Sequence, residues 1–186
     1  MDEVGRGPLA GPVVAAAVVL PLECQITDAY DSKSVPAHRR DSIAIEIFRV
    51  ALAVGIGAAS PREIDLVNIR RATALAMQRA IQRLRVAPQH LLVDGLPVPE
   101  LGLEWQTAVV EGDRRVHSIA CASIIAKVCR DRLMQRLAPR YPGYCWETNM
   151  GYGTPAHLEA LRRLGPTPHH RRSFQPVEQL EHYCET

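Results

Sequence analysis

The chain has 186 residues, of which 47% are hydrophobic and 23% charged, values ordinary for a soluble protein with one domain and one core. Its net charge of +2 excludes a strongly basic surface overall, so any contact with nucleic acid must come from a local patch. Five cysteines without a Cys-x-x-Cys pair argue against a disulfide framework or a zinc site, and they suit a reducing cytoplasm.

The chain opens on two adjacent carboxylates, Asp2 and Glu3, followed by Gly5-Arg6-Gly7. Neighbouring strand residues point to opposite faces, so the two carboxylates share a site only through a bend, a water or a backbone carbonyl. Glycines allow a ligand to approach the backbone closely, and a guanidinium forks well onto phosphate. The stretch suggests a cation site beside a phosphate-binding loop, with a solvated chain start and an ordinary turn as the alternative.

Residues 13–20 form an apolar run between prolines, which predicts a buried strand and is too short to span a bilayer. No basic leader precedes this run, so neither a signal peptide nor membrane association is expected. The loop that follows contains Ser32 and Lys33, whose hydroxyl and amine can hold a phosphate, although such a stretch is more often a turn. A helix is expected over 36–50 and a strand over 51–59.

The next segment begins with a strong helix start, in which Ser60 is the N-cap, Pro61 is the first helical residue and Glu63 completes a capping box. We expect a short helix to about residue 67 and a longer one over 69–85, with an apolar stripe on one face. Arginines occupy the other face of the longer helix, where they are expected to be solvated.

Two short apolar runs, 90–94 and 105–110, predict strands, and each of them leads to a carboxylate. The first ends at Asp94, and the second is followed closely by Asp113. Ligands gather at strand ends in open α/β sheets, so both carboxylates are site candidates, with a turn cap as the alternative.

A helix is expected over about 118–136, with small residues that permit close packing against a sheet or a substrate. Arg130 and Asp131 fall on its more polar side, and Asp131 is either a further candidate ligand or a local ion-pair partner. Tyr152 lies between two glycines before another predicted helix, where it can stack on a sugar or base or bond to the backbone. A last helix is expected over about 176–184.

Four carboxylates therefore stand at strand ends or loop starts: Asp2, Glu3, Asp94 and Asp113. An all-oxygen site suits Mg²⁺ or Mn²⁺, and the residues do not rank one ion over the other. Two such ions held roughly 3.5–4 Å apart activate a water and stabilise the leaving oxygen in a displacement at phosphorus. Asp131 remains an alternative to Asp113, because spacing alone does not decide between them.

These segments resemble the motifs of the bacterial ribonuclease HII family. Residues 2–11 are similar to the opening motif of that family, and the later motifs follow in the family's order over nearly the whole chain. The later segments are Asp31-Ser32-Lys33, Leu92-Val93-Asp94-Gly95, Gly112-Asp113, Ala122-Ser123-Ile124-Ile125-Ala126-Lys127-Val128, Gly151-Tyr152-Gly153-Thr154 and His170-Arg171-Arg172-Ser173-Phe174.

The resemblance implies a ribonuclease H-like α/β fold in which helices flank a central mixed β-sheet. The chain would be a single domain over 1–186, with a helical C-terminal part over about 140–186. The implied activity is metal-dependent cleavage of RNA in RNA–DNA hybrids, and cleavage 5′ of single ribonucleotides in duplex DNA, leaving 3′-hydroxyl and 5′-phosphate ends. The expected partners are these nucleic acids, with no membrane, and the chain is expected to be a monomer.

Matching the motifs residue by residue also implies the site. Four residues match the catalytic metal ligands, and these are Asp2, Glu3, Asp94 and Asp113. Six residues match substrate contacts, and these are Gly5, Arg6, Gly7, Ser32, Lys33 and Tyr152. The glycine-rich loop would read the 2′-hydroxyl that distinguishes RNA from DNA, the serine and lysine would fix register on phosphates, and the tyrosine would stack at the RNA–DNA junction.

Three features raise questions about activity. Glu111 and Met150 stand where the family usually has lysine, which removes positive charge and predicts weaker phosphate binding. Asp2 and Glu3 have almost no strand before them, which predicts a loosely held pair of ligands and poor catalysis. Two rival functions are therefore a hybrid-binding homologue with weak or no turnover, and another two-metal nuclease that acts on DNA.

Overall fold

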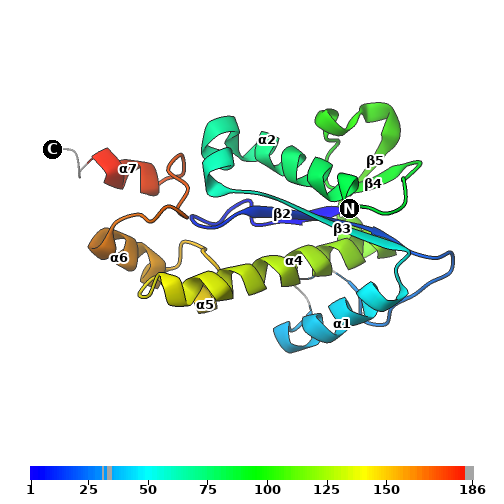
Figure 1. Cartoon of the computed structure of the whole chain (residues 1–186), viewed down its shortest axis with the longest axis horizontal. Coiled ribbons are helices and arrows are strands. Elements are labelled where there is room, and N and C mark those ends of the chain that lie inside the picture. Colours follow the sequence, from blue (N-terminus) through cyan, green and yellow to red (C-terminus); the bar gives the residue numbers. More distant parts are fainter. Residues whose placement is uncertain (31, 33–34, 183–186) are drawn as a thin grey trace.

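The structure is a computed structural model that describes residues 1–30, 32 and 35–182. A β-sheet lies between helix α2 on one face and helices α4 and α1 on the other (Figure 1). The strands are β1 (Asp2–Val4), β2 (Val13–Val19), β3 (Ala53–Ala59), β4 (Leu91–Asp94) and β5 (Gln106–Val109). The α-helices are α1 (Ala37–Val50), α2 (Pro61–Gln82), α3 (Gly112–Arg115), α4 (His117–Leu137), α5 (Trp146–Asn149), α6 (Pro155–Leu164) and α7 (Val177–His182). Short 3₁₀ helices cover Pro99–Leu101, Leu103–Trp105 and Ala138–Arg140.

The sheet is mixed, as the sequence predicts. β1, β2 and β3 pair antiparallel in that order, with Asp2 opposite Ala16, whereas β4 and β5 pair in parallel. The two sets meet at Met1, whose ammonium donates to the carbonyl of Leu92 at 2.6 Å and whose carbonyl accepts from the amide of Asp94 at 3.1 Å. These two bonds form a parallel ladder, so β1 lies beside β4 in the middle of the sheet.

The short first strand is bonded to neighbours along both edges. β2 lies on one side of it, and the bonds of Met1 to β4 lie on the other. Met1 and Asp2 are buried, and helix α4 packs against β1. The loosely held ligand pair that the short lead-in predicts is therefore not found, because strands and a helix surround Asp2 and Glu3 on several sides.

Helix α2 begins as the sequence predicts and contains the predicted break. The side chain of Ser60 accepts a hydrogen bond from the amide of Glu63, and the Glu63 carboxylate accepts from the amide of Ser60. Pro61 is the first helical residue. Asn68 interrupts the helix with a φ of 68°, which divides it close to the predicted boundary between the two helices.

Helix α4 is enclosed on more sides than its sequence pattern predicts. Residues 119–126 are all buried, because α4 packs on β1 and β2 while α1 and α5 cover other parts of it. Arg130, which the sequence pattern places on the more polar side of this helix, is 0% exposed. No helix among the described residues is both long and apolar enough to cross a lipid bilayer.

The C-terminal part folds over one end of α4 through a shared apolar cluster. Trp146 and Leu161 from α5 and α6 pack there with Met134 of α4 and with Leu9, near the start of the chain. Helix α6 starts as predicted: Thr154 caps it by accepting from a backbone amide, and a proline follows at the first helical position. This packing brings the segment after β1 next to residues that lie far along the chain.

Candidate active site

One pocket of about 400 Å³ gathers every predicted site residue that the structure describes. The predicted residues that line it are Asp2, Glu3, Gly5, Arg6, Gly7, Ser32, Asp94, Asp113 and Tyr152. Lys33 lies outside the described residues. Two further polar side chains, Ser123 and Lys127, also line the pocket, and the sequence analysis did not select them individually as site residues.

The topology of the sheet explains why the four carboxylates come together. Asp2 and Glu3 belong to β1, Asp94 is the last residue of β4, and Asp113 lies in α3, just after β5. β1, β4 and β5 run in the same direction, so their carboxyl ends meet at one edge of the sheet, where ligands usually bind. Asp94 also accepts a hydrogen bond at 2.7 Å from the amide of Gly112, which fixes the start of the helix that carries Asp113.

The adjacent carboxylates of Asp2 and Glu3 both line this pocket despite the alternation of a strand. The Oδ1 atom of Asp2 folds back and accepts a hydrogen bond at 2.7 Å from the backbone amide of Glu3. Glu3 reaches the same pocket and forms an ion pair at 3.2 Å with the guanidinium of Arg6. Both carboxylates therefore line one pocket, although the two residues are neighbours in the strand Asp2–Val4.

The first two carboxylates carry negative charge that the protein compensates poorly. Burial raises the pKa of Asp2 to about 7, helped by the negative charges of Glu3 and Asp94 and opposed by the nearby Ser123 hydroxyl. Burial also raises the pKa of Glu3, although the guanidinium of Arg6 opposes that shift. Carboxylates that repel one another in a buried pocket are stabilised by a bound cation.

The donor set fits a hard divalent cation in its chemistry. All four side chains offer carboxylate oxygens, the ligands that Mg²⁺ and Mn²⁺ prefer. Within residues 1–30, 32 and 35–182, however, no group of three or more His, Cys, Asp or Glu side chains is close enough together to hold an ion. The carboxylates therefore share one pocket without forming a closed set of ligands.

The position of Asp131 separates it from the other candidate carboxylates. Asp131 does not line the pocket. Its carboxylate instead pairs with Lys127 at 2.8 Å and with Arg40 at 3.9 Å. Asp113, which does line the pocket, is therefore the better candidate for the fourth ligand.

The loop of Gly5, Arg6 and Gly7 combines one enclosed glycine with one open glycine. Gly5 is buried and has a φ of 88°, whereas Arg6 and Gly7 are exposed. A Cβ atom at residue 7 would meet nothing within 4 Å, so the backbone there is open to a ligand. This half of the loop is the part that a substrate can approach closely.

Helix α4 contributes two polar side chains, Ser123 and Lys127, to the lining of the pocket. Ser123 donates a hydrogen bond at 2.9 Å to the hydroxyl of Ser32, and both side chains are buried. Lys127 lies one helical turn after Ser123, so both side chains project to the same face of α4. Their four-residue spacing within one predicted helix was the available signal that they act together.

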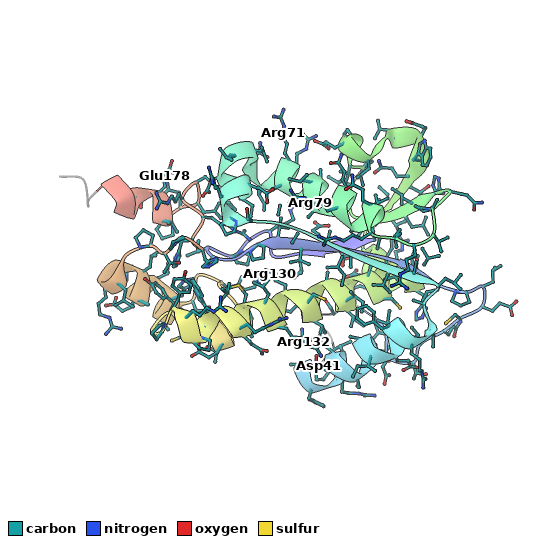
Figure 2. The ribbon with its side chains drawn as sticks, in the orientation of Figure 1. Asp41, Arg71, Arg79, Arg130, Arg132 and Glu178 are labelled. Carbon is teal, nitrogen blue, oxygen red and sulfur yellow. The ribbon has the colours of Figure 1, made fainter. Side chains whose placement is uncertain are left out.

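Tyr152 is half-exposed at the mouth of the pocket, and Arg130 lies behind it. The guanidinium carbon of Arg130 is 5.8 Å from the centre of the Tyr152 ring. Figure 2 labels Arg130 on the side of α4 that faces the sheet and Arg132 on the side toward α1, where Arg132 pairs with Asp41 at 2.8 Å. Only one of these two nearby arginines can therefore influence the pocket.

Two buried histidines form a hydrogen-bonded pair, and one of them, His157, bonds to the backbone of Tyr152. His170 Nδ1 accepts from the amide of Thr167, so its Nε2 carries the proton and donates to His157 Nε2 at 3.0 Å. His157 Nε2 also accepts from the indole of Trp146, so its proton is on Nδ1 and is donated to the carbonyl of Tyr152 at 2.8 Å. Every ring nitrogen is used while both rings are neutral.

Comparison with known proteins identifies the family. The Ribonuclease HII family model matches residues 1–177. Ribonuclease HII of Synechococcus sp. (strain JA-3-3Ab) is 55% identical over 184 residues, covering 97% of this chain and 82% of that protein. Ribonuclease HII of Thermosynechococcus vestitus is 56% identical over 176 residues, covering 94% of this chain and 81% of that protein.

Solved structures give the same fold. Ribonuclease H2 from Pyrococcus horikoshii OT3 superimposes with a TM-score of 0.83 at 24% identity, covering all of this chain and 97% of that chain. Bst ribonuclease HIII, solved in complex with Mn²⁺, gives a TM-score of 0.74 at 18% identity, covering 99% of this chain and 68% of that chain. The fold, the family match and the close bacterial relatives together show that the chain belongs to the ribonuclease HII family and is a ribonuclease H endonuclease.

Proposed function

We propose that this enzyme hydrolyses RNA in RNA–DNA hybrids and cuts duplex DNA on the 5′ side of a single embedded ribonucleotide. The products would carry 3′-hydroxyl and 5′-phosphate ends. The observation that carries the proposal is the single pocket that joins four carboxylates to the Gly5–Gly7 loop and to Tyr152. Metal-binding groups and groups suited to a nucleotide thus face the same space.

Asp2, Glu3, Asp94 and Asp113 would hold Mg²⁺ or Mn²⁺. Bound there, two ions would supply an activated water and stabilise the leaving oxygen in an in-line displacement at phosphorus. The raised pKa values of Asp2 and Glu3 support this assignment, because the buried negative charge has little compensation from the protein. The positions of the four carboxylates would set where the ions bind, and so where the phosphate of the substrate is held.

The substrate contacts follow from what each side chain exposes. The open backbone at Gly7 suits close approach to a ribose, where the 2′-hydroxyl is the group that distinguishes RNA from DNA. Tyr152 offers a ring face on which a sugar or base can stack. On the opposite wall, Lys127 and Ser32 can donate to phosphate oxygens, which would position the strand without reading its sequence.

The proposal is tested by cleavage of a DNA duplex that holds one ribonucleotide, with Mg²⁺ or Mn²⁺, beside an all-DNA duplex of the same sequence. The expected result is a metal-dependent cut 5′ of the ribonucleotide and no cut in the DNA duplex. Asp94→Asn should remove the cut, because it removes a ligand that faces the pocket. Glu104→Gln is the matched control, since Glu104 is an exposed acid that does not line this pocket.

Equal cleavage of both duplexes would overturn the proposal in favour of a DNA nuclease. Binding of the ribonucleotide duplex without any metal-dependent product would overturn the hydrolytic part. Full activity of Asp94→Asn would show that the reaction takes place elsewhere on the molecule.

A further inference from the structure

Two arginines are buried beneath the active-site loop, and neither has a carboxylate partner among the residues that the structure describes. Arg130 of α4 and Arg171, in the segment between α6 and α7, are each 0% exposed. Among the described residues, neither guanidinium lies within 4.0 Å of a carboxylate oxygen in an ion pair. Burying an unpaired charge is costly, so a fold that keeps two of them must use their hydrogen bonds.

All the hydrogen bonds that they donate to described residues go to backbone carbonyls, and most of these carbonyls belong to one segment. Arg171 donates to the carbonyls of Gly11 at 3.0 Å and Arg6 at 2.8 Å, and also to that of Gly5. Arg130 donates to the carbonyls of Pro12 at 3.0 Å and Ala10 at 3.1 Å. The segment from residue 5 to residue 12 therefore wraps around two guanidinium groups.

The direction of these carbonyls determines the direction of the neighbouring amides. In a planar trans peptide, the carbonyl of one residue and the N–H of the next point in opposite directions. Because the carbonyls of Gly5 and Arg6 point inward to Arg171, the N–H groups of Arg6 and Gly7 point away from Arg171. Neither of these amides donates a hydrogen bond to any residue that the structure describes, and both residues line the pocket.

Arg130 links this loop to the aromatic side of the pocket. Besides its bonds to the segment 5–12, Arg130 donates to the carbonyl of Met150 at 2.9 Å. Its guanidinium also lies 5.8 Å from the ring centre of Tyr152. One buried side chain thus sets the distance between the loop and the stacking residue.

We propose that Arg171 and Arg130 are positioning residues that hold the Arg6 and Gly7 amides ready for the ribose, and so set the preference for ribonucleotide over deoxyribonucleotide. This inference rests on the proposed function of the pocket. Neither arginine touches the substrate; each acts through the backbone that it holds. A lysine at either position keeps the charge but lacks the planar fork that reaches three carbonyls.

The test compares binding of a duplex holding one ribonucleotide with binding of the all-DNA duplex, using fluorescence anisotropy without divalent metal. The preference is measured as the Kd for the all-DNA duplex divided by the Kd for the ribonucleotide duplex. In Arg171→Lys, this ratio should fall at least about tenfold, the scale of one lost hydrogen bond. The Kd for the all-DNA duplex should stay unchanged, because Arg171 makes no phosphate contact from its buried position. Arg172→Lys, an exposed neighbour with the same chemical change, should keep the ratio.

A purely structural role would weaken binding of both duplexes equally, and that result would overturn the inference. Arg130→Lys provides a second, independent reading of the same ratio if Arg171→Lys does not fold. In the wild-type protein, the amide resonances of Arg6 and Gly7 should shift on addition of the ribonucleotide duplex and much less with the DNA duplex; equal shifts would also overturn it. If the wild-type enzyme shows no preference, the proposed function fails. If the wild-type enzyme shows the preference and the variants keep it, this inference alone fails.

Discussion

A Cβ atom at residue 5 would lie 2.1 Å from Nε of Arg130, well inside van der Waals contact. The φ of Gly5 is also 88°, in the left-handed region that favours glycine. Space and backbone conformation therefore both exclude a side chain at the start of the Gly5–Gly7 loop. Gly7 differs in both respects, because a Cβ there would meet nothing within 4 Å and its φ lies outside that region.

Gly5→Ala should lower the free energy of unfolding by about 2–4 kcal/mol, since it adds backbone strain and overpacks a buried site. Cleavage should fall with it, because Arg130 cannot keep its bonds to the loop. Urea denaturation measures the first effect and a single-turnover assay the second. Gly7→Ala is the control: its stability should stay within about 1 kcal/mol of wild type, and any loss of cleavage there would report on substrate approach.

Asp113→Asn and Asp131→Asn should differ sharply in activity. Asp113 lines the pocket, whereas Asp131 is paired with Lys127 and Arg40 outside it. We expect Asp113→Asn to lose at least about a hundredfold in the cleavage rate, the scale of losing a group that positions a catalytic metal. Asp131→Asn should keep activity within about tenfold, because the loss of Asp131 reaches the pocket only by releasing Lys127 from its ion pair. The reverse order in a rate assay at saturating Mn²⁺ would reassign the fourth ligand.

The histidine pair predicts a stability that depends on pH. Burial, with the nearby His157 and His169, lowers the pKa of His170 to about 3. Between pH 6.5 and 3 the unfolded chain therefore binds a proton that the folded His170 does not, so stability falls as the pH falls through this window. The expected cost is about 1.4 kcal/mol per pH unit.

Denaturation at pH 7.0 and 5.5 measures this cost as a difference between the wild-type protein and His170→Asn. The comparison is needed because Asp2 has a raised pKa and gives the opposite slope in the metal-free protein. The variant should be the less sensitive of the two to acid. Replacing the exposed His38 by Asn should leave the wild-type slope unchanged, and an equal effect from both variants would contradict the buried network as its source.

Glu111→Lys should strengthen binding of the hybrid. Glu111 is exposed, and the one ion pair that it makes with a described residue is a long one of 3.7 Å to Arg114, so stability should change little. Changing its charge by two beside the pocket should raise affinity about tenfold at low salt and steepen the dependence of log Kd on log salt. Glu23→Lys is a matched control, because Glu23 is also exposed with a positive φ, whereas no pocket residue lies within two positions of it as Asp113 does for Glu111. Similar gains in affinity from both variants would show that the net charge of the protein, and not the position of residue 111, causes the effect.

Much of the fold and most of the site could be predicted because the signals are local. The capping box at Ser60 needs only four consecutive residues, and the carboxylates Asp94 and Asp113 follow apolar runs that mark the ends of strands. Strand direction then brings them to one edge. Local pattern and general sheet topology were enough for these residues.

Arg130 and Arg171 could not be predicted, for two physical reasons. Their partners are backbone carbonyls, which are the same in every residue and leave no complementary side chain in the sequence. Arg130 also looks accessible by helical periodicity, because that pattern treats a helix as having one solvent face, whereas α4 is covered on several sides. Buried polar groups that bind distant backbone become visible only once the chain is folded.

The bond between Arg171 and the carbonyl of Gly5 joins residues 166 positions apart, and this separation affects the order in which the enzyme matures. During synthesis, all four pocket carboxylates have left the ribosome well before Arg171 does. A nascent chain therefore contains the four pocket carboxylates before it contains the guanidinium that binds the carbonyls of Gly5 and Arg6. On the proposal above, selectivity for ribose would be acquired last, and a chain that ends before Arg171 would lose this discrimination while keeping all four pocket carboxylates.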